Sequence, residues 1–487
     1  MSSIEVHLDN TIDGYRQFIA IKQLPRYEIH GRMAVVPDEY ASLLGIHTEE
    51  PAAVGYRAKA GLFDYQRDIV RTAIQKRKFA IFADCGLGKT LMLLEFARHV
   101  RKACPDKPTL IVCPLMVVGQ TIAEAEKFYG NKLPVEQVAA KDLAEWLTKP
   151  GGRLGITNYD ALRDDTPDGN LAGLILDESS MLKSHYGKWG QVCLRLGAGV
   201  PYKLALTGTP APNDRIEYAN HAVFLDAFPN VNSFLARFFV NRGQTNERWE
   251  LKPHALRPFY RALSHWCIFL TDPSTYGWKD NVSTIPPIHV HIHDVDLSAE
   301  QNKVIQGETG QLFVTSLGGI TSRAKLSRMA KCDRSTKPAF IRDLIESWPD
   351  ESTLVWCKYN DEQDMLAEVI PGAASIDGST PPEERQRLVD DFKAGRVRVL
   401  ISKPKILGFG LNLQVCTRQV FSGLQDSYEE YYQAVKRSNR VGSTRPLNVH
   451  IPITEVERPM VDNVLRKARR VDADTREQEA MFRESSK

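Results

Sequence analysis

A glycine-rich segment with one lysine and one threonine lies at residues 83–90, which read Ala-Asp-Cys-Gly-Leu-Gly-Lys-Thr. Its two glycines, Gly86 and Gly88, allow the backbone to turn N–H groups toward an anion. The apolar run before the segment predicts a strand, and the pattern after it predicts a helix whose N-terminus adds partial positive charge. Lys89 is placed to reach nucleotide phosphates, and the Thr90 hydroxyl is placed to reach Mg²⁺. The predicted phosphate-binding residues are Gly86, Leu87, Gly88, Lys89 and Thr90.

A pair of carboxylates follows another apolar run in "GLILDESS", where Gly173–Leu176 predicts a strand that ends at Asp177 and Glu178. Asp177 would hold a metal ion, directly or through water, and Glu178 would polarise an attacking water. Taken alone, the pair fits an acidic helix cap equally well. Together with the glycine-rich segment it predicts a site that hydrolyses a nucleoside triphosphate, with Thr90 and Asp177 as magnesium ligands.

Two other segments carry weaker signals. Thr207, Gly208 and Thr209 follow an apolar run in "LALTGTPAPN", and the hydroxyls there could link the nucleotide site to a bound strand. Gln66, in "LFDYQRDIV", could read an adenine edge beside an aromatic side chain. Each of these segments by itself fits a plain turn or an amphipathic helix equally well.

Short apolar runs alternate with helical patterns twice along the chain, and this alternation predicts two α/β lobes with parallel sheets. The first set stops near Pro210, and the second begins after the Pro-Pro pair of "NVSTIPPIHVHIHDVDLS". Predicted helices include Leu91–Arg101 and Val118–Tyr129. The predicted strands are Lys78–Ala83, Thr109–Cys113, Leu154–Asn158, Gly173–Leu176 and Lys203–Leu206, then Leu354–Lys358, Ala374–Ile376, Val397–Ile401, Gln419–Phe421 and Val449–Pro452.

The composition suits a protein of at least two globular domains, because 487 residues exceed what one core usually organises. Lys and Arg number 63 against 60 Asp and Glu, so a nucleic-acid surface would have to be a local patch. The eight cysteines form no C-x-x-C pair, and no stretch resembles a signal peptide or a membrane span. We expect a reduced, cytoplasmic setting.

The patterns divide the chain into five predicted parts. The arginines and aromatic residues between the two lobes could grip nucleic acid. Alternatively, the aromatic residues could pack into a core and leave the arginines in solvent, and the sequence leaves both interpretations open. The parts are an N-terminal accessory segment at 1–60, a first lobe at 61–225, a basic and aromatic helical insert at 226–285, a second lobe at 286–455 and a charged C-terminal helix at 456–487.

The ordered segments LFDYQ, ADCGLGKT, LIVCP, ITNYD, LDESS and LTGTP resemble the first lobe of a superfamily 2 helicase. Segments of the second half resemble the Swi/Snf-type translocases, above all "SIDGSTPPEERQRLVDDFKAGRVRVLIS", "GFGLNL" and "YYQAVKRSNRVGSTRPLNVHIPI". The resemblance covers 61–225 and 286–455. It implies two RecA-like lobes in tandem, with ATP bound in the cleft between them.

Gln433, Arg437 and Arg440 are spaced four and three residues apart in a predicted helix, which places them on one face. Their spacing alone would fit a surface basic helix. By the family pattern, Arg437 and Arg440 reach across the cleft to the γ-phosphate and stabilise the transition state, with Gln433 in the same nucleotide site. The same pattern assigns Gly410 and Asn412 to the loop that links nucleotide state to the nucleic acid.

Departures from the family pattern indicate a divergent, phage-encoded or bacterial member, and therefore the cytoplasm of a bacterial or phage-infected cell. The usual Asp-Glu-Ala-His is Asp-Glu-Ser-Ser at 177–180, Ser443 stands where a glutamine is usual, and "SKPKILGFGLNL" carries Lys-Pro-Lys in place of small residues. None of these departures removes a catalytic group.

The resemblance implies a nucleic-acid-stimulated ATPase that uses ATP and magnesium to move along duplex DNA. It would contact the DNA backbone and would lack sequence specificity. We expect a monomeric motor without a membrane, with possible protein partners bound through 1–60 and 226–285. Two alternatives stay open, namely a strand-separating helicase on RNA or single-stranded DNA and a nucleotide-gated binding module that barely hydrolyses ATP.

Overall fold

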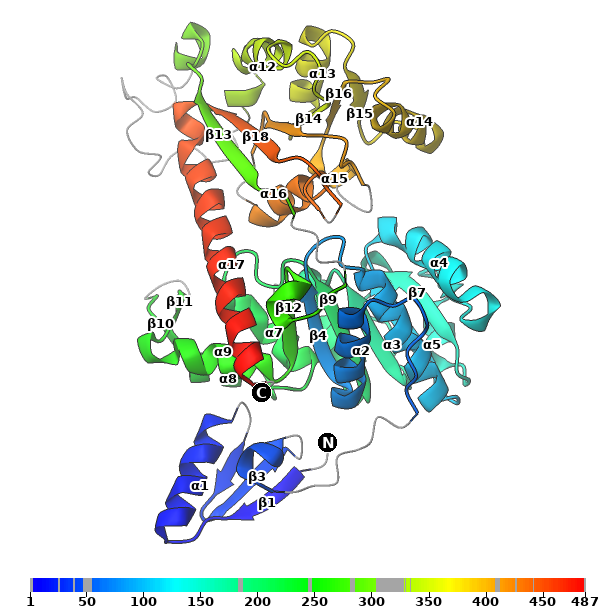
Figure 1. Ribbon diagram of the computed structural model, residues 1–487, viewed down its shortest axis with the longest axis vertical. Helices are drawn as coiled ribbons and strands as arrows, with labels where there is room; N and C mark the ends of the chain where they lie inside the picture. Colours follow the sequence, from blue (N-terminus) through cyan, green and yellow to red (C-terminus); the bar gives the residue numbers. More distant parts are fainter. Residues whose placement is uncertain are drawn as a thin grey trace. The chain divides into compact units, whose positions relative to one another are not determined.

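The computed structural model divides into two compact units, Met1–Val282 with Asp472–Lys487, and Ser283–Val471. Each unit contains one parallel sheet flanked by helices (Figure 1). Within the described part of the chain, none of the helices is long and apolar enough to cross a membrane. The described residues are 3–24, 27–37, 40–46, 55–182, 187–243, 248–280, 285–303, 328, 330–332, 334–407, 412–424, 427–440 and 442–485.

Seven parallel strands form the sheet of the first unit, in the order β12-β4-β9-β8-β5-β7-β6. Most are short runs of buried apolar residues, as expected where helices cover both faces of a sheet. Because β9 pairs with both β4 and β8, the segments that follow these three strands meet at one edge. The strands are β4 Lys78–Ala83, β5 Thr109–Cys113, β6 Glu136–Gln137, β7 Leu154–Asn158, β8 Gly173–Asp177, β9 Tyr202–Thr207 and β12 Cys267–Leu270.

The five strands predicted for this lobe are confirmed to within one residue at either end, but the predicted stop near Pro210 is wrong. β12 lies in the region expected to be a helical insert, and it pairs in parallel with β4. The amide of Ala80 donates to the Trp266 carbonyl at 2.8 Å, and the amide of Asp84 donates to the Leu270 carbonyl at 2.9 Å. The inserted region therefore completes the sheet beside the strand that leads into the glycine-rich segment.

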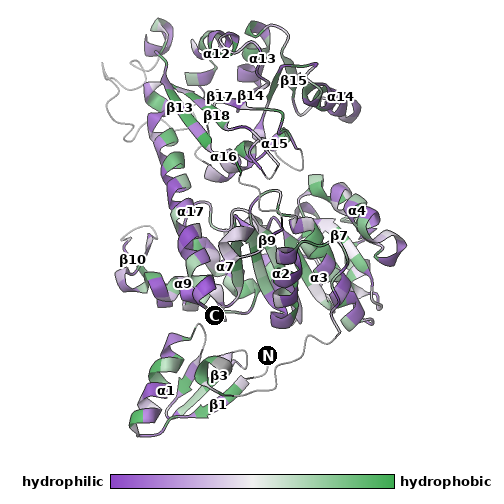
Figure 2. Cartoon of the chain, in the orientation of Figure 1, coloured by the Kyte–Doolittle hydropathy of each residue, from purple (hydrophilic) through white to green (hydrophobic). Residues whose placement is uncertain are grey.

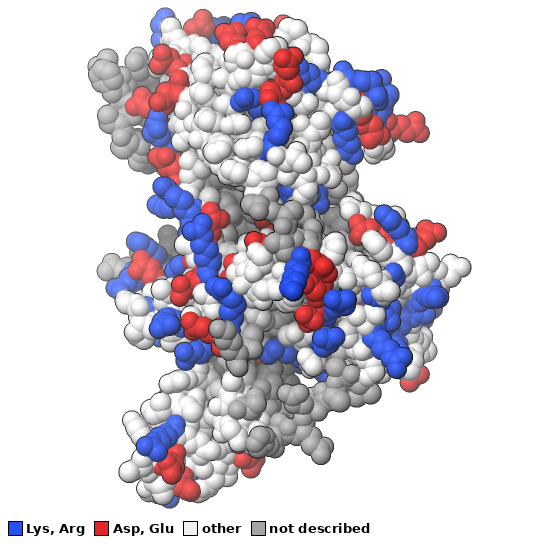
Figure 3. All heavy atoms as spheres, viewed as in Figure 1, with Lys and Arg blue, Asp and Glu red and all other residues white. Residues whose placement is uncertain are grey.

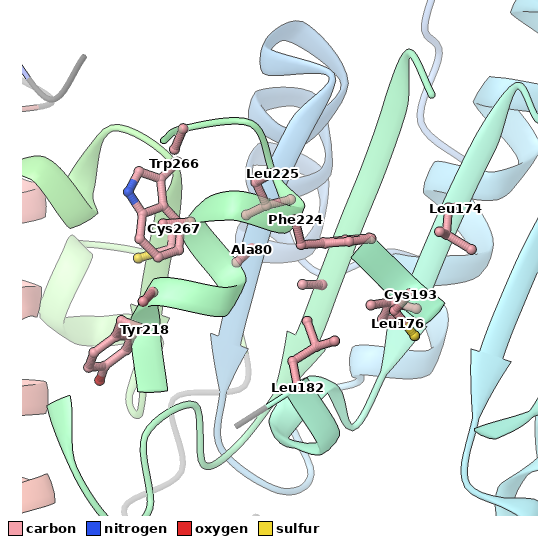
Figure 4. Packing of buried hydrophobic residues seen from close by; sticks show 14 of the residues in the cluster. Ala80, Leu174, Leu176, Leu182, Cys193, Tyr218, Phe224, Leu225, Trp266 and Cys267 are labelled. Carbon is pink, nitrogen blue, oxygen red and sulfur yellow. The ribbon is translucent and has the colours of Figure 1, made fainter. Parts of the chain in front are cut away.

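Helices pack on this sheet because its strands present apolar side chains in both directions. Ala80 and Phe82 of β4 belong to a core cluster that also holds residues of α7 and α9. Figure 4 shows part of that cluster, with Tyr218, Phe224 and Trp266 around the strands, and Figure 2 shows the apolar strands beneath helices of mixed polarity. Both predicted helices are confirmed, within α3 and α4. The helices are α2 Asp64–Lys76, α3 Lys89–Ala103, α4 Leu115–Tyr129, α5 Leu143–Thr148, α6 Lys188–Leu196, α7 Tyr218–Phe224, α8 Val231–Phe238 and α9 Leu256–Ser264.

The aromatic side chains of residues 226–285 pack largely into the core of this unit. Phe234, Phe238 and Phe259 are no more than 1% exposed, and their rings meet edge to face at centroid distances of 5.3, 5.5 and 6.1 Å. Arg257 in the same region stays exposed. These rings therefore support the interpretation that the aromatic residues pack into a core, because buried rings cannot stack on bases.

The N-terminal region forms a small three-stranded antiparallel sheet in the order β1-β3-β2, with one helix. It has a core of its own that includes Val6, Ile21 and Val36. A separate two-stranded hairpin, β10-β11, lies between α8 and α9. The bounds are β1 Ser3–His7, α1 Ile12–Gln23, β2 Glu28–His30, β3 Met33–Pro37, β10 Phe239–Asn241 and β11 Trp249–Leu251.

The second unit has six parallel strands in the order β13-β18-β17-β14-β16-β15. The five strands predicted here are confirmed, with ends displaced by up to two residues, and β13 adds a sixth from the segment after the Pro-Pro pair. The strands are β13 Ile288–Asp294, β14 Thr353–Trp356, β15 Ala374–Ile376, β16 Val399–Ser402, β17 Arg418–Phe421 and β18 Leu447–Ile453. The helices are α12 Lys337–Glu346, α13 Asn360–Val369, α14 Pro382–Lys393, α15 Pro404–Leu407 and α16 Tyr428–Val435.

The last helix, α17 Arg458–Ser485, contributes side chains to both cores. Val461 and Val464 belong to the core of the second unit, and Met481 belongs to that of the first. Within the first unit, the Asp474 carboxylate accepts hydrogen bonds from Arg215 at 2.6 Å and from Tyr260 at 2.7 Å. The helix predicted for the end of the chain is therefore present, and buried polar groups fix its C-terminal half.

Candidate nucleotide-binding site

The glycine-rich segment forms the turn between β4 and α3. Gly86 and Gly88 have φ angles of 90° and 76°, in the left-handed region that residues with a side chain rarely adopt. Gly88 is the N-cap of α3, so the first N–H groups of that helix have no intrahelical acceptor. Lys89 Nζ donates to the carbonyl oxygens of Ala83 at 2.8 Å and Asp84 at 3.3 Å. The segment thus has the backbone shape of a phosphate cradle, and the lysine lies across it.

The charge of Lys89 is stabilised by its surroundings. Burial by itself lowers the pKa of this amine, but electrostatic interactions with four acidic neighbours more than offset burial and raise the pKa above its ordinary value. Lys89 is therefore a cation at neutral pH and lies close to the carboxylates at the end of β8. The four neighbours, in order of effect, are Cys85, Glu178, Asp177 and Asp84.

The first turn of α2 packs directly against the cradle. Tyr65 Oη and Gln66 Nε2 both donate to the Leu87 carbonyl, at 3.0 and 3.3 Å. Gln66 Oε1 accepts from the Phe63 amide at 3.1 Å, so both ends of the side-chain amide are engaged. A Cβ atom at Gly88 would lie 2.3 Å from Gln66 Nε2, which adds a steric reason for glycine there. Gln66 therefore supports the loop, and its contact with adenine stays a prediction.

Trp278 is a residue near this site that the sequence analysis did not single out. Its ring packs on Tyr65 at a centroid distance of 6.2 Å, and its Nε1 donates to the Asp68 carboxylate at 2.9 Å. The available signal was one tryptophan in the turn "TYGWKD", and such a turn does not indicate which helix the ring contacts.

Asp177 ends β8 and is buried beneath the edge of the sheet. Its Oδ1 accepts from the Glu178 amide at 3.1 Å, and its backbone carbonyl accepts from Tyr159 Oη at 2.9 Å. Burial, followed by the charge of Glu178, raises the pKa of Asp177 to about 7, while Lys89 acts in the opposite direction. The carboxyl is therefore poised between its two protonation states near neutral pH.

Glu178 has a φ angle of 50°, which is uncommon for a residue with a side chain and typical of functional turns. Its Oε2 accepts from the Thr207 hydroxyl at 3.2 Å, and that hydroxyl oxygen accepts from the Thr209 amide at 3.1 Å. Gly208 forms the bend between the two threonines. Because Thr207 ends β9 opposite Phe82 of β4, this relay connects the carboxylate after β8 to the loop after β9.

The Asp-Glu-Ser-Ser departure has a structural counterpart in α7. Ser179 is fully buried, and its Oγ lies 3.0 Å from Nε2 of His221 in a hydrogen bond. Burial lowers the pKa of His221 to about 4. The residue after the carboxylate pair is therefore held by a neutral buried imidazole.

We predict that His221 makes the first unit sensitive to acid. The folded state keeps this histidine neutral down to a pKa of about 4, whereas the unfolded chain binds a proton below about 6.5. Stability from this residue is therefore complete above pH 6.5 and is lost as the pH falls toward 4, by about 3 kcal/mol in all. His221→Gln should reduce the fall in melting temperature between pH 7 and pH 4.5. An unchanged fall in the variant would contradict the assignment.

The residues that would hold Mg²⁺ are Thr90, in the first turn of α3, and Asp177. Two adjacent carboxylates, Asp177 and Glu178, face one lysine, and the pKa of Asp177 is raised first by burial and then by the charge of Glu178. A divalent cation would balance that excess, and oxygen donors suit magnesium. Among the described residues, no group of three or more His, Cys, Asp or Glu side chains could hold a metal. The residues therefore fit an ion held by few protein ligands together with substrate phosphates.

In the second unit, the prediction that three residues share one helical face is wrong. α16 ends at Val435, so Gln433 is helical while Arg437 and Arg440 lie in the turns that follow. Arg437 is 8% exposed, and its carbonyl accepts from the Leu413 amide at 2.9 Å. The two arginines are therefore presented by a turn, here called the arginine turn and comprising residues 436–440.

A buried glutamine lies at the point where the helix stops. Gln419 Nε2 donates to the Ala434 carbonyl at 3.1 Å and to Ser438 Oγ at 2.8 Å. In a continuing helix, the Ser438 amide would bond that same carbonyl, but it donates to Val435 at 3.2 Å instead. The other end of the glutamine, Oε1, accepts from Trp356 Nε1 at 3.0 Å. The side chain of Gln419 thus connects β14 to the arginine turn.

Ser443, which departs from the family pattern, stabilises the same turn. Its Oγ donates to the Ser438 carbonyl at 2.8 Å and accepts from the Arg440 amide at 3.2 Å. Asn412 Nδ2 donates to Gln414 Oε1 at 2.9 Å, so this residue is engaged locally. The other predicted loop residue, Gly410, lies outside the described residues.

We predict that Gln419→Leu both destabilises the second unit and loosens the arginine turn. The change removes three hydrogen bonds. The buried Trp356 Nε1 donor loses its acceptor, and the Ala434 carbonyl and the Ser438 hydroxyl each lose a donor, at about 1–3 kcal/mol for each buried group left unsatisfied. Unfolding monitored by tryptophan fluorescence should shift to lower denaturant. The matched control is Gln386→Leu on the exposed side of α14, for which a change within about 0.5 kcal/mol is expected. Equal effects of the two variants would contradict the role of Gln419.

Two family models match the chain, the SNF2-related domain at residues 65–340 and the helicase conserved C-terminal domain at 336–442. The chain is 24% identical to the DNA annealing helicase and endonuclease ZRANB3 of Mus musculus, over 81% of this chain and 38% of that protein. It is 26% identical to putative protein p41 of Acyrthosiphon pisum secondary endosymbiont phage 1, over 79% of this chain and 91% of that one. It is 24% identical to putative ATP-dependent helicase/translocase YwqA of Bacillus subtilis, over 76% and 43%.

This chain spans 38% of the length of the mouse relative, so that protein has much sequence with no counterpart here. The SNF2-related model covers more than half of the 487 residues and contains the phosphate cradle, the carboxylate pair and the Thr207 relay. The resemblance inferred from the ordered motifs is confirmed by these matches. With its two RecA-like lobes and the two matched domains, the chain belongs to the SNF2-related family.

Proposed function

We propose that this protein is an ATP-dependent motor that moves along duplex DNA without reading its sequence. The observation that carries this proposal is the meeting of Lys89, Glu178 and Thr207 at one edge of the first sheet, after the neighbouring strands β4, β8 and β9. Phosphate binding, hydrolytic chemistry and a relay toward the next loop thus meet in one place. An enzyme that only hydrolyses a nucleotide needs the first two but has no use for the third.

In the proposed reaction, the loop amides and Lys89 bind the ATP phosphates. Glu178 orients the attacking water and takes its proton, and the hydroxyl of Thr207 holds that carboxylate in place. Magnesium, held by Thr90 and Asp177, would supply charge neutralisation on the phosphate oxygens. When phosphate leaves, the hydrogen bond between Glu178 and Thr207 could break, and the loop after β9 that contains Thr209 could change its conformation.

The second lobe would contribute positive charge to the γ-phosphate in the transition state. Arg437 and Arg440 are the proposed donors, with Gln433 beside them and Gly410 and Asn412 in the coupling loop. The hydrogen bonds of Gln419 and Ser443 support this proposal, because a fixed turn can hold charges ready before the reaction.

Duplex DNA is the proposed track because the mouse relative is described by its name as a DNA annealing helicase. The contacts would be made to the sugar-phosphate backbone, which positions a motor but carries no sequence information. We further propose a monomeric motor whose protein partners bind the N-terminal region or residues 226–285. The proposed cellular setting is the cytoplasm of a bacterium or phage-infected host, in line with the phage relative.

The experiment is steady-state phosphate release with no nucleic acid, duplex DNA, single-stranded DNA and RNA. We expect duplex DNA to raise kcat the most. Stimulation by RNA alone would overturn the choice of track, and a DNA-saturated rate equal to the unstimulated rate would favour a nucleotide-gated binding module instead.

A further inference from the structure

A pocket of about 700 Å³ opens on the first unit beside the last turns of α3. Its lining contains six basic side chains, and the described lining residues include no Asp or Glu. The chain as a whole is almost balanced, with 63 Lys and Arg against 60 Asp and Glu, so a wall of one sign is not a consequence of composition. We call it the basic pocket. Its basic residues are Arg57, Lys59, Arg98, Arg101, Lys102 and Lys132.

The basic pocket lies at the opposite edge of the sheet from the nucleotide residues. Lys89 opens α3 at the carboxyl end of β4, and Arg101 is twelve residues further along the helix, about 18 Å away at the α-helical rise. Arg101 Nε donates to the carbonyl of Gly152 at 3.0 Å, just before β7 begins at Leu154. Substitutions in this pocket therefore leave the groups around Lys89 untouched.

A buried glutamate holds one wall of the pocket in place. Glu95 is fully buried, and its carboxylate accepts from Arg98 Nε at 2.9 Å, from Tyr129 Oη at 2.7 Å and from the Lys59 amide at 3.0 Å. Arg98 Nη2 donates in turn to the Arg57 carbonyl at 2.7 Å. The segment before α2 is thus fixed against α3 and α4, and its basic side chains are held beside those of the helix.

Within the described part of the chain, most of the basic side chains on this wall have no carboxylate partner. The charge of Glu95 offsets that of Arg98, while Lys102 and Lys132 are exposed. One of the two other guanidinium nitrogens of Arg101, Nη1, is shielded from solvent and has no acceptor among the described residues. Figure 3 shows Lys and Arg side chains gathered on the side of this unit that carries α3 to α5. Positive charges held close together create a positive electrostatic potential, and a bound anion would reduce the repulsion between them.

We propose that the basic pocket binds the phosphodiester backbone of nucleic acid, as a second contact remote from the ATP site. The proposal rests on the motor function proposed above, for which an additional grip on the track would limit dissociation between steps. Lysine and arginine side chains with apolar neighbours such as Phe128 and Leu133 provide charge but few fixed acceptors for reading bases. A backbone ligand fits this chemistry, and binding there would be independent of sequence and sensitive to salt.

The test is equilibrium binding of the full chain to a fluorescent 30-base-pair duplex, without ATP, across a series of salt concentrations. The variant is Lys102→Glu with Lys132→Glu, two exposed residues whose replacement leaves the Glu95 contacts intact. The control is Lys141→Glu with Arg257→Glu, which makes the same charge change at exposed positions outside the pocket. Unchanged melting temperatures establish that both variants are folded.

We expect the pocket variant to bind about 10- to 100-fold more weakly near 0.1 M salt, with a salt slope shallower by about 1.8, or about 0.9 for each phosphate that the variant no longer neutralises. The control should keep the wild-type slope. Equal slopes in all three proteins, or equal weakening in variant and control, would overturn the proposal. Weaker binding of tripolyphosphate to the variant by calorimetry, with DNA binding unchanged, would assign the pocket to a free polyphosphate and also overturn it. Because this test uses no ATP, its result is independent of the ATPase experiments.

Discussion

Lys89→Ala is expected to lower ATP turnover by about 10³-fold or more, the size of effect seen when a positive charge that stabilises the transition state of phosphoryl transfer is removed. In the structure the amine lies across the glycine-rich loop, bonded to the carbonyls of Ala83 and Asp84. Its raised pKa keeps it charged at any pH where the protein would be assayed. Phosphate release with saturating duplex DNA is the measurement.

Loss of Lys89 also removes a cation that lowers the pKa of Asp177. The carboxyl should then take up a proton more readily, which opposes metal binding as well as phosphate binding. Lys141→Ala is the control, since that lysine is exposed and remote from the loop. Normal turnover by a folded Lys89→Ala protein would show that the cradle is not the hydrolytic site.

Glu178→Gln is expected to lower turnover by about 10²–10⁴-fold, the usual contribution of a positioned general base. The amide can keep the hydrogen bond from Thr207, so the loop after β9 should stay in place. Nucleotide binding should be retained, because the change removes a base and not a phosphate contact. Separate measurements of kcat and of the ATP dissociation constant, made on the same preparation, distinguish these effects.

Thr207→Val provides a matched comparison for Glu178→Gln. It keeps the size of the side chain and removes the hydroxyl that links Glu178 to the Thr209 amide. Turnover without DNA should fall little, whereas stimulation by DNA should fall more. If Glu178→Gln weakened ATP binding as much as it lowered kcat, the carboxylate would be holding the nucleotide and not activating water.

The parts of this fold that the sequence predicts best are the buried parallel strands. They appear as short apolar runs because both of their faces are covered. β12 escaped prediction because Cys267–Leu270 is a four-residue run among aromatic residues, and nothing local indicates that it returns to pair with β4. The sequence pattern therefore predicts that the first sheet ends near Pro210, whereas the structure adds β12 to that sheet through hydrogen bonds to β4.

The candidate site also contains some residues that the sequence predicts and some contacts that it does not. Local motifs identified Lys89, Asp177 and Glu178, since glycine spacing and a strand end are visible along the chain. The sequence does not show the hydrogen bond from Thr207 to Glu178, because these residues are 29 positions apart. It does not show the hydrogen bond between Trp356 and Gln419 either, because those residues are 63 positions apart. The arginine turn shows why the spacing of Gln433, Arg437 and Arg440 gave a wrong prediction. Residues four and three positions apart share a face only within a helix, and α16 ends at Val435.

The central claim is directed movement along duplex DNA driven by ATP, and displacement of the third strand from a DNA triplex tests it most directly. We predict that the wild-type protein releases the third strand in the presence of ATP and magnesium. Without ATP, or with Lys89→Ala, release should stay at the spontaneous rate. Rapid DNA-stimulated ATP hydrolysis by the wild-type protein with no release of the third strand would contradict the account.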